Sequence, residues 1–515
     1  MSLLPKIVQG SAMHVVEQAI RLTCALWLTP RMLNYLGETN YGLWGLLTSI
    51  FTQFVLLDLG LCTSMPRFLS RAIGQGNTEE LCRSASTGTA GMFIIGVLAQ
   101  IAGVVTWFGL PWFLKESHEL GEARNVVIAL MVTSLTFWLG RPLMLHLQSQ
   151  LRRDLIALAS IMRLLITTPS VAWALSNGRG IETVAWIHAL GALGELILFF
   201  FFDRAFFRLV RWPWVNRAKA RELLVFARWS YVLTTSERIR SGFSGADLFI
   251  VAAFLGSAMS GIYSLGQRLA YIFYEVAYAI VGAQLLSTFS QLDGAGDRER
   301  LKQSFVAASR ISAQLAVIGG GILWATGPAF LKRWVPAQAE EATPVLLYLI
   351  IPHILCATQI PSRHLLISLA RHRPLALTCL AGILLNLLLT VLWVQNFGMV
   401  GAAIATFVEM TLLYGIAIPW LVITQTEFPR RLVVWESLWK PLLKSSLLLS
   451  PAILSTHLWL GAAMATYTEI ASAIVLLAVV FFTFLALGLL GKEEKRWFLT
   501  GYEILFKRPR PAVNA

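Results

Sequence analysis

The sequence predicts an all-α polytopic membrane protein with about 14 transmembrane helices, built from two related six-helix halves and two additional C-terminal helices. Three observations support this fold class. The 515 residues are 56% hydrophobic and only 14% charged, whereas soluble domains carry about a quarter charged residues. Apolar runs of about 20 residues, each long enough to cross a hydrocarbon core about 30 Å thick, recur along the whole chain. One loop sequence also occurs twice, 220 residues apart.

The apolar runs define the candidate spans in order. We expect spans at 9–33, 41–66, 84–111, 123–147, 155–175, 181–202, 226–254, 260–287, 305–330, 343–367, 374–395, 400–423, 442–461 and 468–490. The polar segments between them are too short to form a separate soluble domain. The first span has neither a basic leader nor a small-residue cleavage site, so we expect it to be retained rather than removed as a signal peptide.

Basic residues in the connecting loops predict the orientation. One alternating set of loops is rich in arginine and lysine, including Arg152 and Arg153, the segment 204–221 and the tail from Lys492 to Arg510. Because cytoplasmic loops retain positive charge, these loops and both termini are predicted to be cytoplasmic. The net charge of +14 therefore indicates membrane topology rather than nucleic-acid binding. The five cysteines have no metal-type spacing and are predicted to pack as small apolar side chains.

The first span carries charged residues near its middle. Glu17 and Arg21 are four residues apart, His14 lies one turn earlier and Gln18 is adjacent, so on a helix they form one polar stripe. A charge at the bilayer centre costs about 2.5–3.5 kcal/mol on insertion scales, so such residues usually face a bundle interior or an aqueous cavity. The alternative is a pair that neutralises itself and fixes helix packing, and this helix alone does not decide between the two.

The duplicated loop relates the two halves. Gly74, Gly76, Glu79 and Leu81 after the second span correspond to Gly294, Gly296, Glu299 and Leu301 after the eighth. Each copy predicts a glycine turn followed by a helix that Asn77 or Asp297 caps. Since both preceding spans run toward the cytoplasm, the halves are predicted to be parallel repeats related by an axis along the membrane normal.

The same offset relates Glu17 to Glu237 in the seventh span. Arg238 and Arg240 stand beside Glu237, and Thr234 and Ser241 continue a polar stripe of small residues. The first helix of each half therefore carries a carboxylate and an arginine at mid-depth. Together the two helices predict a cationic cavity between the halves.

The eighth span adds a second polar stripe. Arg268, Tyr271, Glu275 and Tyr278 follow one another at spacings of three to four residues, so a helix places them on one face. We expect that face to line the cavity.

Several other polar residues inside the predicted spans can be interpreted in two ways. Each of the following fits either cavity lining or a satisfied structural contact: Asp58, Arg163, Glu195, Asp247 and Glu409. Arg67, toward the cytoplasmic end of the second span, fits either cavity lining or a simple loop charge. His353 and His364 in the tenth span are expected to be packing residues.

No catalytic motif is present in the sequence. It lacks HExxH, GxSxG, a Walker A sequence, paired CxxC motifs and a soluble domain bearing DxD. The protein is therefore expected not to be an enzyme and to need no cofactor. Without an ATP-binding motif, it is expected to move a substrate down a gradient or to couple it to a proton or sodium ion.

Several motifs carry a family resemblance that covers nearly the whole chain. Tyr41-Gly42-Leu43-Trp44, Asp58-Leu59-Gly60-Leu61, Arg67-Phe68-Leu69-Ser70, Gly261-Ile262-Tyr263-Ser264 and the segment from Phe397 to Thr406 occur in order. With the span number and the repeat, they resemble polysaccharide transporters of the O-antigen flippase type, in the multidrug/oligosaccharidyl-lipid/polysaccharide exporter superfamily.

The resemblance implies two six-helix lobes forming a V with a central cavity that opens alternately to each side. The expected organisation is an N-terminal lobe at 1–202, a basic cytoplasmic linker at 203–225, a C-terminal lobe at 226–423, two additional helices at 424–490 and a basic cytoplasmic tail at 491–515. The resemblance also implies a bacterial inner-membrane protein that moves a polyprenyl-pyrophosphate-linked oligosaccharide to the outer leaflet. Expected partners are this lipid-linked oligosaccharide, membrane lipids, and the glycosyltransferases and polymerase of the same pathway, but not nucleic acid.

The residues already named fit that chemistry. Arginine presents a planar fork of donors suited to diphosphate oxygens, and a sugar chain needs polar and aromatic walls. The predicted substrate-binding residues are Arg21, Arg238, Arg268, Tyr271, Thr234 and Ser241. The carboxylates predicted to pair with these arginines or to carry a coupling ion are Glu17, Asp58, Glu237 and Glu275.

Two other functions compete with this interpretation. An ion-coupled multidrug exporter of the same superfamily would need an acidic, aromatic cavity, which the arginines in mid-membrane disfavour. A membrane polysaccharide polymerase or ligase would usually work at a sizeable outer loop, and all predicted outer loops are short.

Overall fold

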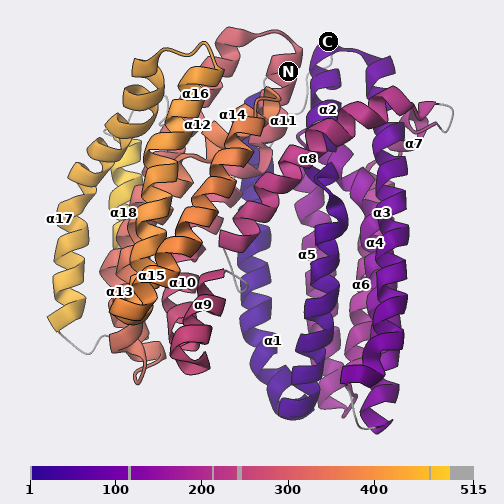
Figure 1. The fold of residues 1–515 in the computed structure, drawn as a ribbon, viewed down its shortest axis with the longest axis horizontal. Coiled ribbons are helices and arrows are strands. Elements are labelled where there is room, and N and C mark those ends of the chain that lie inside the picture. The colour runs from indigo at the N-terminus through magenta and orange to yellow at the C-terminus, as the bar shows by residue number, and fades with distance from the viewer. Residues whose placement is uncertain (1–2, 114–116, 212–213, 241–245, 463–465, 488–515) are drawn as a thin grey trace. The chain divides into compact units, whose positions relative to one another are not determined.

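The computed structural model describes residues 3–113, 117–211, 214–240, 246–462 and 466–487. Within these ranges the chain forms helices and their connections, with no β-strand (Figure 1). Nine helical stretches in this described part are long and apolar enough to cross a membrane. The prediction of an all-α polytopic membrane protein is confirmed.

The helices fall into two compact units. One unit comprises Gln9–Tyr231 and the other comprises Met1–Val8 with Val232–Ala515, so the boundary lies inside a helix. We refer to them as the N-terminal and C-terminal units. Each is described by itself.

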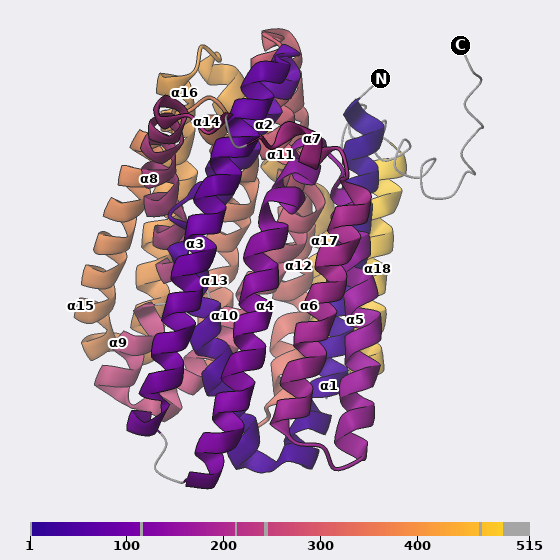
Figure 2. The same cartoon turned by 90° about the vertical axis from the view of Figure 1, so that its right-hand side faces the viewer.

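The N-terminal unit is built from the first helices of the chain. Their bounds are α1 Leu3–Gln53, η1 Phe54–Asp58, α2 Leu61–Gln75, α3 Thr78–Phe113, α4 Ser117–Ser149, α5 Arg153–Ser176, α6 Ile181–Phe202, the short α7 Phe206–Leu209 and the first part of α8 Arg217–Arg240. Figure 2 shows α3, α4, α6 and α5 running side by side, and α4 packs against both α3 and α6. Small and branched side chains such as Val126, Val127 and Ala185 form the core between them.

The C-terminal unit continues from the end of α8. Its helices are α9 Ala246–Leu255, α10 Ser257–Ala277, η3 Tyr278–Gly282, α11 Ala283–Gly294, α12 Arg298–Trp334, α13 Ala339–Thr358, α14 Ile360–Ser368, α15 Arg373–Leu412, η4 Leu413–Ala417, α16 Ile418–Gln425, η5 Arg431–Trp439, α17 Lys440–Ala462 and α18 Tyr467–Ala486. One core lies where α10, α13 and α15 meet, around Tyr263, Leu346 and Ala402. A second core joins α12 to α17 and α18.

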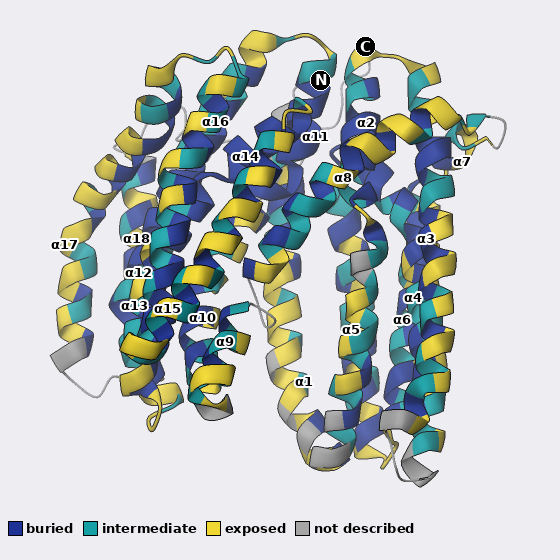
Figure 3. Ribbon diagram, viewed as in Figure 1, coloured by how far each residue is buried: buried dark blue, intermediate teal, exposed yellow. Residues whose placement is uncertain are grey.

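Large apolar side chains are exposed along several helices. On α3, Phe93, Val105 and Phe108 are between 59% and 68% exposed, and exposed positions recur along α3 and α17 in Figure 3. A soluble monomer rarely exposes such continuous apolar surface. These faces are suited to contact lipid, in agreement with a multi-pass membrane protein.

Several predicted spans are not simple straight helices. The first two join in α1, where only Gly37 leaves helical geometry (φ 75°, ψ 170°). The second span then breaks at Leu59 and Gly60, both left-handed, before α2 begins. The tenth span is interrupted at Gln359 between α13 and α14. Breaks inside spans free backbone groups and let side chains turn toward a cavity, and hydropathy alone does not reveal them.

The predicted repeat is present in the backbone hydrogen bonds. The Asn77 amide donates to the Ala72 carbonyl and the Asp297 amide to the Leu292 carbonyl, both at 3.1 Å. Gly76 and Gly296 have φ of 66° and 72°, which glycine adopts without strain from a Cβ atom. The Asn77 carboxamide accepts the Glu80 amide at 3.0 Å, and the Asp297 carboxylate accepts the Arg300 amide at 3.1 Å. Both predicted caps are confirmed.

The duplication extends well beyond this loop. Among the described residues, eight of the ten with positive φ form four pairs that lie 219 or 220 positions apart. These pairs are Gly37 with Gly256, Gly76 with Gly296, Leu151 with Ala370, and Gly178 with Gly398. The two remaining residues, Leu59 and Gly60, mark the break in the second span, and at the same offset the eighth span carries the π-helical turn η3. The helix ends of the two units therefore follow one plan.

A candidate substrate cavity in the C-terminal unit

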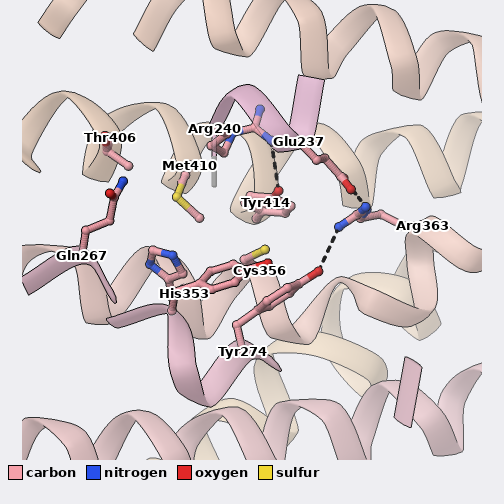
Figure 4. Close-up of a pocket in the computed structure, with 11 residues that line it drawn as sticks. Glu237, Arg240, Gln267, Tyr274, His353, Cys356, Arg363, Thr406, Met410 and Tyr414 are labelled. Carbon is pink, nitrogen blue, oxygen red and sulfur yellow. Dashed lines mark hydrogen bonds and ion pairs between the residues drawn. The ribbon is translucent and has the colours of Figure 1, made fainter. Parts of the chain in front are cut away.

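A polar cavity lies among the helices of the C-terminal unit. The cavity is open on one side, and its volume is about 530 Å³ when the solvent-filled opening is included. The residues that line it are Glu237, Arg240, Gln267, Tyr271, Tyr274, His353, Cys356, Arg363, Thr406, Met410 and Tyr414 (Figure 4). They come from α8, α10, α13, α14, α15 and η4. Polar residues inside the helix bundle of a membrane protein usually mark the path or site of a substrate.

Arg240, at the end of α8, forms a buried ion pair with Glu409 of α15. Its Nη2 donates to Oε1 at 2.9 Å and its Nε donates to Oε2 at 3.3 Å, so the fork of the guanidinium matches both carboxylate oxygens. Nη1 also donates to the Tyr414 hydroxyl at 3.3 Å, and Nη2 to the Cys379 carbonyl at 3.4 Å. The side chains of Arg240 and Glu409 are only 5% and 0% exposed. This pair fixes one wall of the cavity.

A second arginine faces the cavity from α14. Arg363 forms an ion pair with Glu237 of α8, and its Nη1 donates to the Tyr274 hydroxyl at 3.4 Å. In Figure 4 the Arg363 side chain extends between Glu237 and Tyr274. Gln359 ends α13 and Pro361 stands in the first turn of α14, so this short helix starts afresh where the span is interrupted. The interruption places Arg363 at the cavity.

Aromatic rings form a further side of the cavity. Tyr271 and Tyr274 lie on one face of α10, with ring centroids 5.3 Å apart. The ring of His353 packs edge-on to Tyr271 at 5.9 Å, and its Nδ1 bonds the Leu349 carbonyl one turn earlier at 2.7 Å. His364 bonds the Ile360 carbonyl in the same way at 2.8 Å. Both histidines bond a carbonyl of their own helix, and His353 also lines the cavity.

The predicted site residues of this unit are distributed between the cavity and the surface. Glu237 and Tyr271 line the cavity, and Thr234 is half-buried on α8. Three others are exposed on the surfaces of α8 and α10: Arg238, Arg268 and Glu275. Ser241 lies outside the described residues.

The predicted residues of the N-terminal unit contact other residues of the same unit. Glu17 on α1 is buried, its Oε2 lies 3.0 Å from His14 Nδ1, and it forms an ion pair with Arg21, whose side chain is 52% exposed. Arg153 on α5 reaches the same group, with Nη2 3.2 Å from His14 Nδ1. Asp58 is buried at the break in the second span and accepts the Cys62 amide at 2.7 Å. It therefore satisfies a free amide at the start of α2.

Two of the charges left open by the sequence form an ion pair. Arg163 donates to Glu195 at 2.7 Å, between α5 and α6. Glu409, another charged residue with two possible interpretations, is the ion-pair partner of Arg240. Arg363 is a charged cavity residue that none of the sequence motifs includes. An arginine within the apolar tenth span was the available signal, because such a residue needs a partner.

Comparison with known proteins identifies the family. The family model described as "Polysaccharide biosynthesis protein" matches residues 36–318, which is more than half of the chain. The chain belongs to this polysaccharide biosynthesis protein family. No curated protein matches its sequence significantly.

Solved structures show which fold this family member has. A Vibrio cholerae MATE transporter, VcmN, superposes with a TM-score of 0.71 at 13% identity, over 84% of this chain and 98% of its own. The MATE transporter ClbM in complex with Rb+ gives a TM-score of 0.69 at 16% identity, over 84% and 97%. A Pyrococcus furiosus transporter of the MOP superfamily gives 0.69 at 14% identity, over 82% and 96%. The polysaccharide biosynthesis protein therefore has the MATE transporter fold.

Proposed function

We propose that this protein is a flippase for a polyprenyl-pyrophosphate-linked oligosaccharide. It would move the repeat unit from the cytoplasmic to the outer leaflet of the bacterial inner membrane by alternating access, with both termini in the cytoplasm. The glycan would serve O-antigen, exopolysaccharide or capsule synthesis. The family, the transporter fold and the charges in the cavity support this proposal.

The observation that carries the proposal is the presence of two arginines, Arg240 and Arg363, at one cavity lined mostly by helices that are apolar enough to cross a membrane. A diphosphate offers several anionic oxygens, and each guanidinium can bind two of them. In the structure each arginine holds a carboxylate instead, Glu409 or Glu237. The carboxylates would keep the arginines compensated when the cavity is empty, and the diphosphate would replace one of them when substrate enters.

The remaining parts of the substrate have suitable surroundings. Tyr271, Tyr274 and Gln267 offer flat aromatic faces and polar groups to sugar rings. The polyprenyl chain is apolar and would stay in the lipid. The predicted ligands Arg21, Arg238 and Arg268 would then engage the diphosphate on its way to or from this cavity.

A multidrug exporter of the same superfamily is the second candidate. Tyrosines together with Glu237 would suit a cationic drug, but an arginine pairs with each of the cavity's carboxylates and would repel such a substrate. The Pyrococcus furiosus transporter is described as having a binding pocket of reverse polarity, which suggests a different function for that protein. Pocket charge is therefore a feature that distinguishes transporters of this fold. A polymerase or ligase finds no comparable support.

Purified protein in proteoliposomes tests the proposal. Lipid-linked oligosaccharide with a fluorescent label on its glycan is placed in both leaflets, and a membrane-impermeant quencher reports how fast the protected fraction becomes accessible. We expect the wild type to translocate this lipid, Arg363→Ala to lose most of the activity, and Arg363→Lys to recover only part because lysine lacks the planar fork.

The matched control is Arg310→Ala. Arg310 also forms an ion pair with a glutamate, Glu436, at 3.1 Å, but at the packing surface between α12 and η5. Its translocation rate should stay near that of the wild type. Extrusion of cationic dyes without movement of the lipid would instead support the exporter.

A further inference from the structure

A strongly basic segment connects α6 to the start of α8 in the N-terminal unit. This basic segment, residues 203–221, holds six basic side chains and one acidic side chain. Two of the seven have partners, because Asp203 pairs with His146 at 2.6 Å and Lys219 pairs with one glutamate of α3 and one of α8. The other five are exposed, and none of them forms an ion pair within the described part of the chain: Arg204, Arg208, Arg211, Arg217 and Arg221.

The corresponding connection of the C-terminal unit lacks this excess of positive charge. At the offset of 220 it comprises residues 423–441, with three basic side chains and two glutamates. Glu436 there pairs with both Lys440 and Arg310. Both connections follow the last helix of a repeated half, so membrane topology alone would give them similar charge. The unpaired arginines of the basic segment therefore need a further explanation.

Hydrogen bonds fasten the described part of the basic segment to α3. The Ser86 hydroxyl donates to the Leu209 carbonyl at 3.4 Å and accepts the Arg211 amide at 3.0 Å. The Asn216 amide donates to the Thr87 hydroxyl at 3.3 Å. The exposed arginines therefore project from a backbone that is fixed to the rest of the N-terminal unit.

Exposed aromatic rings accompany these arginines. Phe201 and Phe207 are 59% and 50% exposed, and Phe207 stacks on Phe200 with ring centroids 5.1 Å apart. The Arg204 guanidinium lies 5.0 Å from the centroid of the Phe201 ring. Since α6 is long and apolar enough to cross a membrane and ends at Phe202, the rings and the arginines meet where a span leaves the hydrocarbon. Basic side chains beside exposed phenylalanines are typical of surfaces that bind anionic membranes.

An anionic phospholipid matches both features. A guanidinium binds phosphate oxygens through its fork of donors, and the rings can pack against the glycerol and the first part of the acyl chains. A soluble phosphate would leave the rings exposed to water. A zwitterionic lipid has no net charge to offset five cations.

We propose that the basic segment, together with Phe201, is a binding surface for anionic phospholipids. The lipid site does not depend on the proposed transport function. Its assignment to the cytoplasmic leaflet follows from the proposed orientation of the chain.

Native mass spectrometry of the purified full-length protein in non-ionic detergent tests the surface. The protein is titrated with phosphatidylglycerol or with phosphatidylcholine of the same acyl chains, and the lipid-bound fraction is measured. We expect the wild type to prefer phosphatidylglycerol. Arg208→Gln/Arg211→Gln should weaken phosphatidylglycerol binding about tenfold, because each basic residue near an anionic lipid surface adds to the attraction. Phosphatidylcholine binding should change little.

Two matched variants show whether position matters. Arg430→Gln/Arg431→Gln also removes two exposed arginines, from the corresponding connection of the C-terminal unit. Arg179→Gln removes an exposed arginine that precedes α6 at its opposite end. Both variants should bind phosphatidylglycerol like the wild type. Arg208→Lys/Arg211→Lys keeps the charge and should retain most of the binding, and size-exclusion profiles equal to that of the wild type would show that the glutamine variants fold.

Phe207→Ala tests the apolar part of the surface. Loss of the ring should weaken phosphatidylglycerol binding, because the ring contacts the lipid below its head group. If Phe207→Ala binds this lipid like the wild type and inorganic phosphate displaces the lipid, the surface is a site for soluble anions instead.

Two further results would overturn the inference. Equal binding of phosphatidylglycerol and phosphatidylcholine by the wild type would remove the preference for anionic lipid. An equal loss in Arg208→Gln/Arg211→Gln and Arg430→Gln/Arg431→Gln would show that the total charge of the protein, rather than the basic segment, attracts the lipid.

Discussion

Arg240 and Glu409, which are 169 positions apart, form a two-bond ion pair whose side chains are almost completely enclosed. The pair joins the end of α8 to α15 at the cavity. The pair fixes the packing of two helices. In the proposed function it also keeps the Arg240 guanidinium compensated until the diphosphate of the substrate arrives.

Breaking this pair from one side should be costly. Removing one partner of a buried ion pair leaves a charge uncompensated, which typically costs about 3–5 kcal/mol. We expect Arg240→Met and Glu409→Leu each to lower the midpoint of thermal unfolding in detergent strongly, and the double variant to recover most of the loss. If the decrease in thermal midpoint of the double variant equals the sum of the decreases of the two single variants, the two side chains do not stabilise each other.

Gly382 should be intolerant of even a small side chain. A Cβ atom there would stand 2.5 Å from Oε1 of Glu409 and 3.5 Å from Nη2 of Arg240. We expect Gly382→Ala to displace the carboxylate and to lower both stability and translocation. Gly194→Ala is the matched control, because an added Cβ atom at that position of α6 would meet none of the described residues within 4 Å beyond the backbone of its own helix. Equal behaviour of the two variants would contradict the predicted displacement.

The capping residues Asn77 and Asp297 should stabilise the helices that follow them to a similar extent in the two units. Replacing a capping side chain by alanine costs about 1 kcal/mol, so Asn77→Ala and Asp297→Ala should each speed hydrogen exchange in the first turn of the helix that follows. Those helices are α3 and α12. Protection that falls in only one of them would show that the two loops differ in function despite their common geometry.

The contact between η5 and α12 should weaken in acid. A hydrogen bond from Lys440 holds the pKa of Glu436 below its ordinary value, with the positive charges of Lys440 and Arg310 acting in the same direction. A lowered pKa means that the stabilising charge is present at neutral pH and is lost as pH falls through the pKa of the folded state. The difference in thermal midpoint between the wild type and Glu436→Gln should therefore shrink on acidification. A difference that does not depend on pH would refute this.

Part of the site was predictable from α8 alone. Glu237 was identified through its offset from Glu17, and Arg240 follows it at three residues, which places both on one face of a helix. Arg238 is the next residue after Glu237 and points about 100° away around the helix axis. The sequence interpretation chose Arg238 as the substrate ligand, whereas the spacing from Glu237 favours Arg240, which is the buried arginine at the cavity.

The features that could be predicted from the sequence have a local origin. The all-α membrane class, the glycine turns at Gly76 and Gly296 and the caps at Asn77 and Asp297 depend on hydropathy and on hydrogen bonds between near neighbours. By contrast, the ion pair of Arg363 with Glu237 and the hydrogen bonds of Thr390 and Thr406 to Asp247 are visible only in the folded chain. These contacts depend on how each helix is rotated and where it breaks. The rotation of a helix and the position of its break are set by packing against helices that are distant in the sequence. No short stretch of sequence encodes this packing.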